Sequence, residues 1–195
     1  MDSAMLGLPS DVVLRPLFRL ADRRYTVYFD LVDEAALARR QGRAGDEAQA
    51  AAALDARTVD RVVPGEAKDE AAHALEQKNS EGGRYEGRRD RMAYWGGGEF
   101  SYELKLPAAG SAAVGFAAWG GETRRHTFEV VVDGTVIGTQ NLLDDDPGRV
   151  LRVEMPIPAD LTRGRERVRV GFRPAGKEGS IGAIFDVRIL TPGAR

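Results

Sequence analysis

The residue types best suited to contact a ligand lie in the stretch RYEGRRDRMAYWGGG, residues 84–98. Sugars are held by this combination, because an aromatic ring packs on the apolar face of a pyranose or furanose while arginine and carboxylate groups bond the hydroxyls around its rim. Trp119 and the basic turn that follows it could close the same end of the fold. The candidate ligand-binding residues are Arg88, Arg89, Tyr94, Trp95, Trp119, Arg124 and His126.

The same residues allow two other interpretations. An arginine-rich loop followed by Tyr-Trp could instead dock on a neighbouring protein domain, with its aromatic rings buried and its arginines paired to acids. Arginines interleaved with aromatics also occur in nucleic-acid binding, but a net charge of -2 argues against a nucleic-acid partner. Glycan binding and docking are therefore both kept as hypotheses.

Catalytic patterns are weak. The acidic residues between Glu66 and Glu99 could supply a carboxylate pair of the glycosidase kind, but a chain with 30 acidic residues forms such clusters by chance. His73 and His126 lie far apart with no cysteine to complete a zinc site. No Gly-x-Ser-x-Gly elbow occurs. We expect a chain that is not an enzyme and requires no cofactor.

Strands must position these side chains. GGEFSYELKLP alternates apolar and polar residues, with Phe100, Tyr102, Leu104 and Leu106 on one face. In VGFAAWG, Val114, Phe116 and Ala118 share a face and Trp119 lies on the other. HTFEVVVDGTVIGTQ predicts two strands joined by a type I′ turn at Asp133-Gly134.

Three later segments complete the strand pattern. VLRVEMPIP predicts an edge strand, or one that ends at Pro156, because proline cannot donate a ladder bond. RERVRVGF is next, and GAIFDVRIL is predicted to point Ala183, Phe185, Val187 and Ile189 inward. The predicted fold class is therefore all-β, an antiparallel β-sandwich of the jelly-roll kind.

The chain divides into three regions. Residues 1–32 form an extended segment whose strand, with Tyr25, Val27 and Phe29 on one face, could be the end of a preceding domain or a dimerisation edge. Residues 33–57 are predicted to be an alanine-rich helical linker of one or two short helices, with Asp33 as N-cap and glycines 42 and 45 interrupting its middle. A mobile linker is the alternative. Residues 58–195 are the sandwich.

Composition places limits on the class of protein. At 195 residues with 43% hydrophobic residues and no cysteine, the chain can bury a core without disulfides. It contains no apolar run of the ~20 residues that span a bilayer, so we expect no membrane partner. The compartment stays open between bacterial cytoplasm and secretion with a parent enzyme.

The order of motifs resembles a known module. VDRVVPGEAKDEAAH, GRYEGRRDRMAYWGGGEFSYELKL and GAIFDVRIL are similar to the C-terminal accessory module of the β-L-arabinofuranosidase family, glycoside hydrolase family 127, a jelly roll of the galactose-binding-like type. PLFRLADRRYTVYF resembles the end of the domain that precedes that module. The resemblance covers nearly the whole chain but not the helical barrel, where that family carries its catalytic cysteine and glutamate.

The resemblance implies a non-catalytic accessory domain of a glycoside hydrolase. Its partners would be the catalytic domain of that parent hydrolase and a glycan; a purely structural module is the alternative, and a stand-alone glycosidase a third. Jelly rolls of this kind often hold a structural calcium near the first and last strands. The candidate calcium ligands here are Glu66, Glu70 and Asp186.

Overall fold

The computed structural model describes residues 34–93, 97–108, 110–143 and 149–193. Residues 1–32, with the predicted N-terminal strand and its dimerisation edge, lie outside the described residues, as does the predicted N-cap Asp33. By its internal contacts the chain separates into two units, Met1–Asp46 and Glu47–Arg195. The second unit carries every strand that follows.

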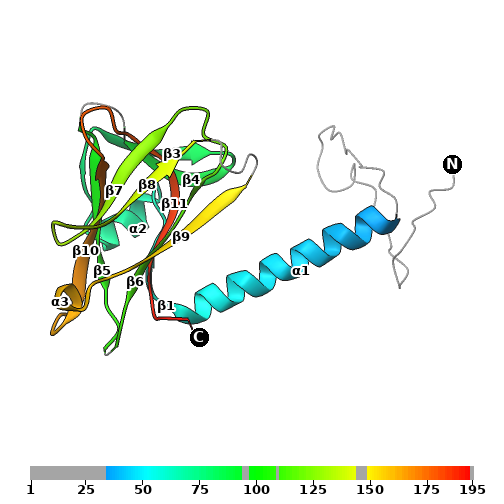
Figure 1. Ribbon diagram of the computed structural model, residues 1–195, viewed down its shortest axis with the longest axis horizontal. Coiled ribbons are helices and arrows are strands. Elements are labelled where there is room, and N and C mark those ends of the chain that lie inside the picture. Colours follow the sequence, from blue (N-terminus) through cyan, green and yellow to red (C-terminus); the bar gives the residue numbers. More distant parts are fainter. Residues whose placement is uncertain (1–33, 94–96, 109, 144–148, 194–195) are drawn as a thin grey trace, which may run out of the picture. The chain divides into compact units, whose positions relative to one another are not determined.

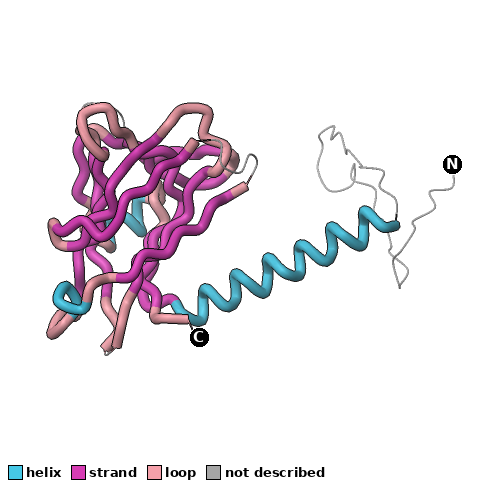
Figure 2. The backbone as a smooth tube through the Cα atoms, viewed as in Figure 1, coloured by secondary structure: helices cyan, strands magenta, loops and turns pink. Residues whose placement is uncertain are grey.

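Two antiparallel sheets form a β-sandwich (Figures 1 and 2). Strands β3, β4, β11, β6 and β9 are hydrogen-bonded in that order, and β1 pairs with β11 beyond the end of β4. The strands of this six-stranded sheet are β1 Thr58–Val62, β3 Ser80–Tyr85, β4 Arg88–Ala93, β6 Ala113–Trp119, β9 Val150–Pro156 and β11 Ile181–Leu190. The predicted fold class is confirmed.

The second sheet has five strands, in the order β2-β5-β10-β7-β8. Its strands are β2 Glu76–Lys78, β5 Glu99–Lys105, β7 His126–Val132, β8 Thr135–Leu142 and β10 Arg167–Pro174. Two short helices, α2 Ala67–Ala72 and α3 Ala159–Thr162, lie in connections between strands. Each sheet therefore has an inner face toward the shared core and an outer face available to partners.

The core follows the alternation seen in the sequence. Phe100, Tyr102 and Leu104 of β5 are at most 2% exposed, while the residues between them point away from the core. Phe172 packs between the layers, with its ring centroid 5.2 Å from Phe100 and 5.4 Å from Phe116. On β6, Phe116 faces this core and Trp119 the opposite side, as predicted.

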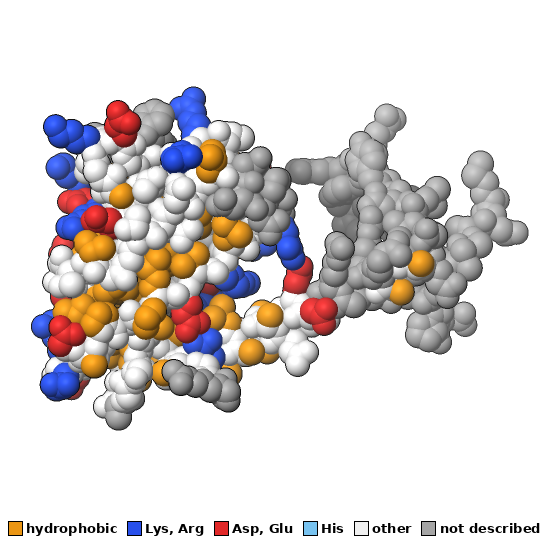
Figure 3. Space-filling view, in the orientation of Figure 1, with side chains coloured by type: hydrophobic (Ala, Val, Ile, Leu, Met, Phe, Trp, Pro, Cys, Tyr) orange, Lys and Arg blue, Asp and Glu red, His pale blue; other side chains and the backbone are white. Residues whose placement is uncertain are grey.

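The turn and edge predictions also hold. Asp133 and Gly134 have φ values of 45° and 83°, the left-handed pair that a type I′ hairpin requires. Strand β9 lies at the edge of its sheet and ends at Pro156. In Figure 3, hydrophobic side chains form a band across the visible face of the sandwich, with charged side chains around its margins.

Strand β11 departs from the predicted pattern. All ten of its residues are buried, and its pairing with β4 and with β6 shifts register near Ile184. Because a bulge reverses the side-chain phase, Ile181 and Ile184 enter the main core, whereas Ala183 and Phe185 pack on the outer face. The inward orientation predicted for Ala183 and Phe185 was therefore wrong, although Val187 and Ile189 do face the core.

The arginine-rich stretch is also different from the loop that the sequence suggested. Strands β3 and β4 form a hairpin whose two-residue turn is Glu86-Gly87, with φ values of 48° and 75°. Side chains along β4 consequently alternate between the two faces of the sheet. Neighbouring arginines of this stretch cannot all reach one ligand.

The alanine-rich segment forms one helix, α1 Glu34–Arg57, rather than two. Glycines 42 and 45 lie inside it. Each glycine lowers the stability of the helix by up to ~1 kcal/mol relative to alanine, and the strong helix formers around them offset this loss. The last turn is fixed to the sandwich: Arg57 Nε donates to Thr191 O at 2.9 Å, and Thr58 Oγ1 donates to Leu54 O at 2.8 Å.

Candidate functional site: the Trp119 surface

The best ligand candidate is a hollow at one end of the outer face of the six-stranded sheet. Its volume is about 700 Å³. Three parts of the sheet supply most of its lining: the β3–β4 turn, and, on the other side of β11, the end of β6 and the start of its neighbour β9. The lining residues, here called the Trp119 surface, are Glu47, Ala50, Glu86, Arg88, Trp119, Arg149, Val150, Leu151 and Arg152.

An apolar cluster supports this surface from the sheet. Ala117, Ala183 and Phe185 are buried on the outer face, and Trp119 and Tyr85 pack against them. The rings of Tyr85 and Trp119 meet edge to face, with centroids 6.1 Å apart and planes at 69°. Trp119 is only half-buried by this packing, so part of its indole faces the hollow.

A buried carboxyl lies next to the aromatic pair. Asp90 of β4 is 3% exposed, and burial, with further contributions from Glu81 and Glu122, raises its pKa to about 6. Burial, together with the nearby carboxylates of Glu122, Glu86 and Asp90, also raises the pKa of the Tyr85 hydroxyl. Tyr85 therefore stays a hydrogen-bond donor at neutral pH, while Asp90 changes from donor to charged acceptor near pH 6.

The turn between β6 and β7 is fastened to the start of β11 by Glu122. Its Oε1 accepts a hydrogen bond from the Ala183 backbone N–H at 3.1 Å, and its Oε2 lies 3.4 Å from His126 Nε2. The other ring nitrogen of His126 is 3.0 Å from Ser180 Oγ. Gly182 leaves room for this contact, because a Cβ there would lie 2.6 Å from Glu122 Oε1 and the glutamate side chain would have to shift.

The structure brings together only part of the predicted ligand set. Arg88 and Trp119 line the same hollow. Arg89 is on the other face of β4, where its Nε lies 3.5 Å from Glu66. Arg124 is exposed and His126 is held by Glu122 and Ser180, and neither lines the hollow. Tyr94 and Trp95 lie outside the described residues.

Sequence reasoning missed the contributions of β9 and of the apolar support. Val150, Leu151 and Arg152 join the hollow because β9 pairs with β6, with Trp119 opposite Val150. Alternation along β9 places Arg152 on the outer face, a signal present in the sequence. Which strand would neighbour Trp119 was not predictable without the topology.

The calcium candidate Glu70 forms a buried ion pair with Arg91. Its two oxygens accept bonds from Arg91 Nε and Nη2, each at 2.7 Å. Tyr102 O–H and the Gly65 N–H donate to the same carboxylate, both at 2.8 Å. Burial opposes the charge of Glu70, but these donors together hold its pKa below the usual value. Its oxygens are already occupied by donors.

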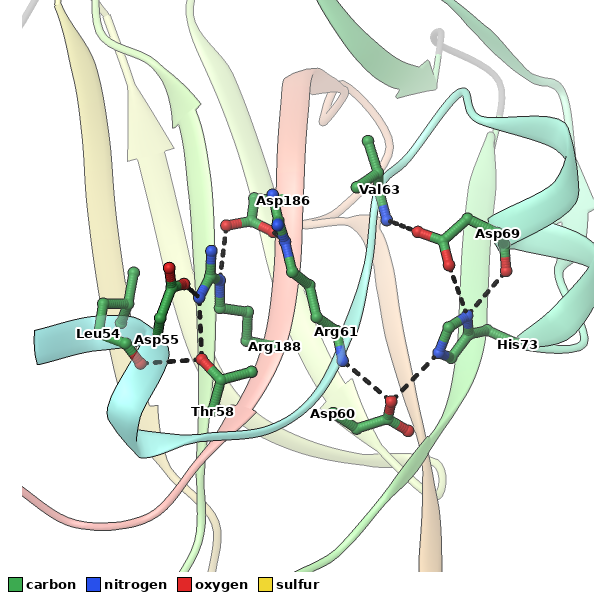
Figure 4. A network of polar contacts seen from close by, with 10 residues as sticks. All are labelled: Leu54, Asp55, Thr58, Asp60, Arg61, Val63, Asp69, His73, Asp186 and Arg188. Atoms are coloured by element: carbon green, nitrogen blue, oxygen red, sulfur yellow. Dashed lines mark hydrogen bonds and ion pairs between the residues drawn. The ribbon is translucent and has the colours of Figure 1, made fainter. Parts of the chain in front are cut away.

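Asp186 is held in a similar way (Figure 4). It accepts from Arg61 Nε and Arg188 Nε, both at 2.7 Å, and Arg188 also contacts Asp55 of α1 and Thr58 of β1. The network joins α1, β1 and β11. The guanidinium groups of two arginines neutralise this carboxylate.

The three carboxylates do not fit a calcium ion. Glu66, Glu70 and Asp186 each face a different arginine, and among the described residues no group of three acidic or histidine side chains could hold a metal. The resemblance suggested that these three carboxylates could share one calcium ion, but in this fold they do not converge on one point. The predicted ligand set is therefore corrected to a set of structural ion pairs.

A family model matches residues 53–190. The chain belongs to DUF6805, a family of unknown function. The DUF6805 region begins in the last turn of α1 and ends at the last residue of β11, so it includes Glu66, Glu70 and Asp186 and the Trp119 surface except Glu47 and Ala50. No curated protein matches the chain.

Solved structures with a similar strand arrangement include carbohydrate-binding modules. A family 35 module from Clostridium thermocellum is 13% identical, with a TM-score of 0.47, over 68% of this chain and 98% of that chain. A family 36 module in complex with calcium and xylotriose is 11% identical, with a TM-score of 0.47, over 66% and 98%. An exo-β-1,3-galactanase from Phanerochaete chrysosporium is 14% identical, with a TM-score of 0.47, over 62% and 28%.

These similarities concern the fold, and no ligand or residue role is transferred from them. Across the described residues, no helix has the length and apolar character needed to cross a membrane.

Proposed function

We propose that this DUF6805 chain is a non-catalytic accessory module of a glycoside hydrolase and that it binds glycan at the Trp119 surface. The observation that carries the proposal is the hollow that Trp119 lines together with Arg88, Arg152 and its strand partner Val150. An indole face and guanidinium donors around one concave surface are the groups a sugar ring requires. The association with a hydrolase rests on the sequence resemblance described above.

The expected affinity is low. One ring face and three neutral hydrogen bonds of ~1 kcal/mol each give about millimolar binding after the cost of association. Such a module would act by raising the local concentration of glycan near a tethered catalytic domain. Binding should therefore be sought at millimolar ligand or with polymeric glycan.

The surroundings of the buried carboxyl groups Asp90 and Glu122 support a non-catalytic role. Glycoside hydrolysis needs two carboxyl groups on opposite sides of the scissile bond. Asp90 has the raised pKa of a proton donor, but Glu122 already accepts from the Ala183 N–H and lies against His126. A screen of aryl glycosides tests this point: turnover by the native chain that disappears in Asp90→Asn would contradict it.

Docking on a neighbouring domain is the second candidate. A smaller groove of about 370 Å³ on the same outer face has a largely apolar lining that includes Leu54 of α1, Ala117 and Val153. A partner domain could cover it together with the Trp119 surface. In that case the isolated chain would bind no glycan, whereas the parent hydrolase would be less stable when Trp119 is changed.

Trp119→Ala separates the two candidates. On a glycan array and in calorimetric titrations, the native chain is expected to bind at least one arabinose-, xylose- or galactose-containing glycan, and Trp119→Ala to weaken that binding tenfold or more. Thr139→Val, on the outer face of the other sheet, is the matched control and should bind normally. Absence of binding by the folded native chain would leave docking as the supported function.

A further inference from the structure

The outer face of the five-stranded sheet carries a second groove, with a volume of about 420 Å³. It lies on the opposite side of the sandwich from the Trp119 surface, since each sheet contributes one outer face. One row of residues in mutual register crosses all five strands. The row is Glu76, Ser101, Gly171, Val131 and Val136, from β2 through β5, β10 and β7 to β8.

Gly171 at the centre of this row has no structural reason to be glycine. It is in the middle of a central strand, and its φ is not positive. A Cβ there would lie 3.4 Å from Ser101 Cβ and 3.9 Å from Val131 Cβ, which are ordinary contacts. Glycine inside a strand costs roughly 0.5–1 kcal/mol relative to alanine, and it often marks a site that a ligand approaches closely.

Arg169 and Arg173, two residues before and after Gly171, line the groove on either side of it. Arg169 is held in place by hydrogen bonds to Ala74 O at 3.1 Å and Ser101 Oγ at 3.2 Å, and Arg173 Nε donates to Glu129 at 2.7 Å. Anchored guanidinium groups lose little side-chain entropy when their remaining N–H groups bind a ligand. These guanidinium groups are thus arranged in advance of binding.

The charges of the groove favour a neutral occupant. Lys78 is opposite Glu99 in the strand register, Arg169 Nη2 is 3.3 Å from Glu76, and Arg173 is paired with Glu129. An anionic ligand would have to compete with these carboxylates. A peptide strand would need a free sheet edge, but β5, β10 and β7 are hydrogen-bonded on both sides.

We infer that this groove binds a neutral linear oligosaccharide laid across the strands, independently of the Trp119 surface. From Glu76 to Val131 the groove crosses three strand spacings, about 14 Å, which accommodates a short run of monosaccharide units. The hydroxyls would bond Arg169, Arg173 and Ser101, while the apolar face of the sugars packs over Gly171 and Val131. A module with one site on each outer face could hold two glycan segments at once.

The test is an NMR titration of the full native chain with neutral hexasaccharides from linear arabinan, xylan, β-1,3-galactan and β-1,4-glucan. We expect at least one of them to shift the backbone amides of Ser101, Gly171 and Val131. In Gly171→Val these shifts should weaken tenfold or more while the melting temperature does not fall, because a β-branched residue suits a strand. Ser101→Val gives a second way to fill the groove should Gly171→Val fold poorly.

Two controls separate this inference from the proposed function. Trp119→Ala should leave the groove shifts intact, and Thr139→Val, on the same sheet but outside the groove, should change nothing. The inference is overturned if no neutral hexasaccharide shifts these amides, if folded Gly171→Val binds as well as the native chain, or if Trp119→Ala removes the shifts. Tighter binding of a hexagalacturonate than of every neutral probe would also overturn it.

Discussion

Two of the buried carboxylates in the described part of the chain differ from a third in their expected response to pH. Glu70 and Asp186 are neutralised by arginines, whereas Asp90 is buried with acidic groups nearby and has a raised pKa. Charge on Asp90 therefore opposes folding at neutral pH.

Asp90→Asn is expected to change the pH dependence of stability. The folded-state pKa of about 6 lies above the ordinary value of 3.8, so the native chain is favoured below pH 4 and loses stability as pH rises through 6. The loss attributable to Asp90 is roughly 3 kcal/mol, at ~1.4 kcal/mol per pKa unit. When the free energy of unfolding is measured with denaturant from pH 4 to 7, the stability of Asp90→Asn relative to the native chain should rise by about that amount. A difference in stability that does not change with pH would contradict the raised pKa of Asp90.

For the Glu70–Arg91 pair we expect the opposite effect, because removing one charge should destabilise the protein. Arg91→Met leaves a carboxylate that is 5% exposed without its main partner, and breaking a buried pair in this way costs about 3–5 kcal/mol. The matched control is Arg167→Met, because Arg167 pairs with Glu103 at the surface, where such pairs contribute about 0–1 kcal/mol. Equal losses in the two variants by urea denaturation would show that Glu70 is solvated.

At the level of elements, regular alternation was enough to predict β5, β6, β7, β8, β9 and β10. Strand β11 was predicted as well, but the orientation of Ala183 and Phe185 was not, because the shift near Ile184 reverses which side chains face the core. Alternation failed for the β3–β4 hairpin, whose strands carry arginine and glycine and few apolar residues. Glu86-Gly87 was the available turn signal.

The candidate site was predictable in part for the same reason. Trp119 and Arg88 stand out by residue type, but their partner strand β9 is distant in sequence and joins them only through sheet pairing. Glu66, Glu70 and Asp186 looked like cation ligands by type. Only the structure shows that arginines from β4 and β11 reach Glu70 and Asp186.

At the level of the whole molecule, the last turn of α1 belongs to the sandwich. Arg188 is 6% exposed and bonds Asp55 and Thr58 as well as Asp186. A chain that begins at Glu47 should therefore melt at the same temperature as the full chain. A chain that begins at Val59 should melt lower, and equal melting of all three in calorimetry would show that α1 contributes nothing to the sandwich.

The central claim is that a glycan contacts the exposed part of Trp119. Its most direct test is the indole Nε1–H resonance of Trp119, assigned by its disappearance in Trp119→Phe, during titration with millimolar xylan, arabinan and galactan oligosaccharides. We predict a saturable shift with at least one of them, together with a shift of the Arg88 side chain. A stationary Trp119 resonance across the whole panel, with the protein folded, would contradict glycan binding at this surface.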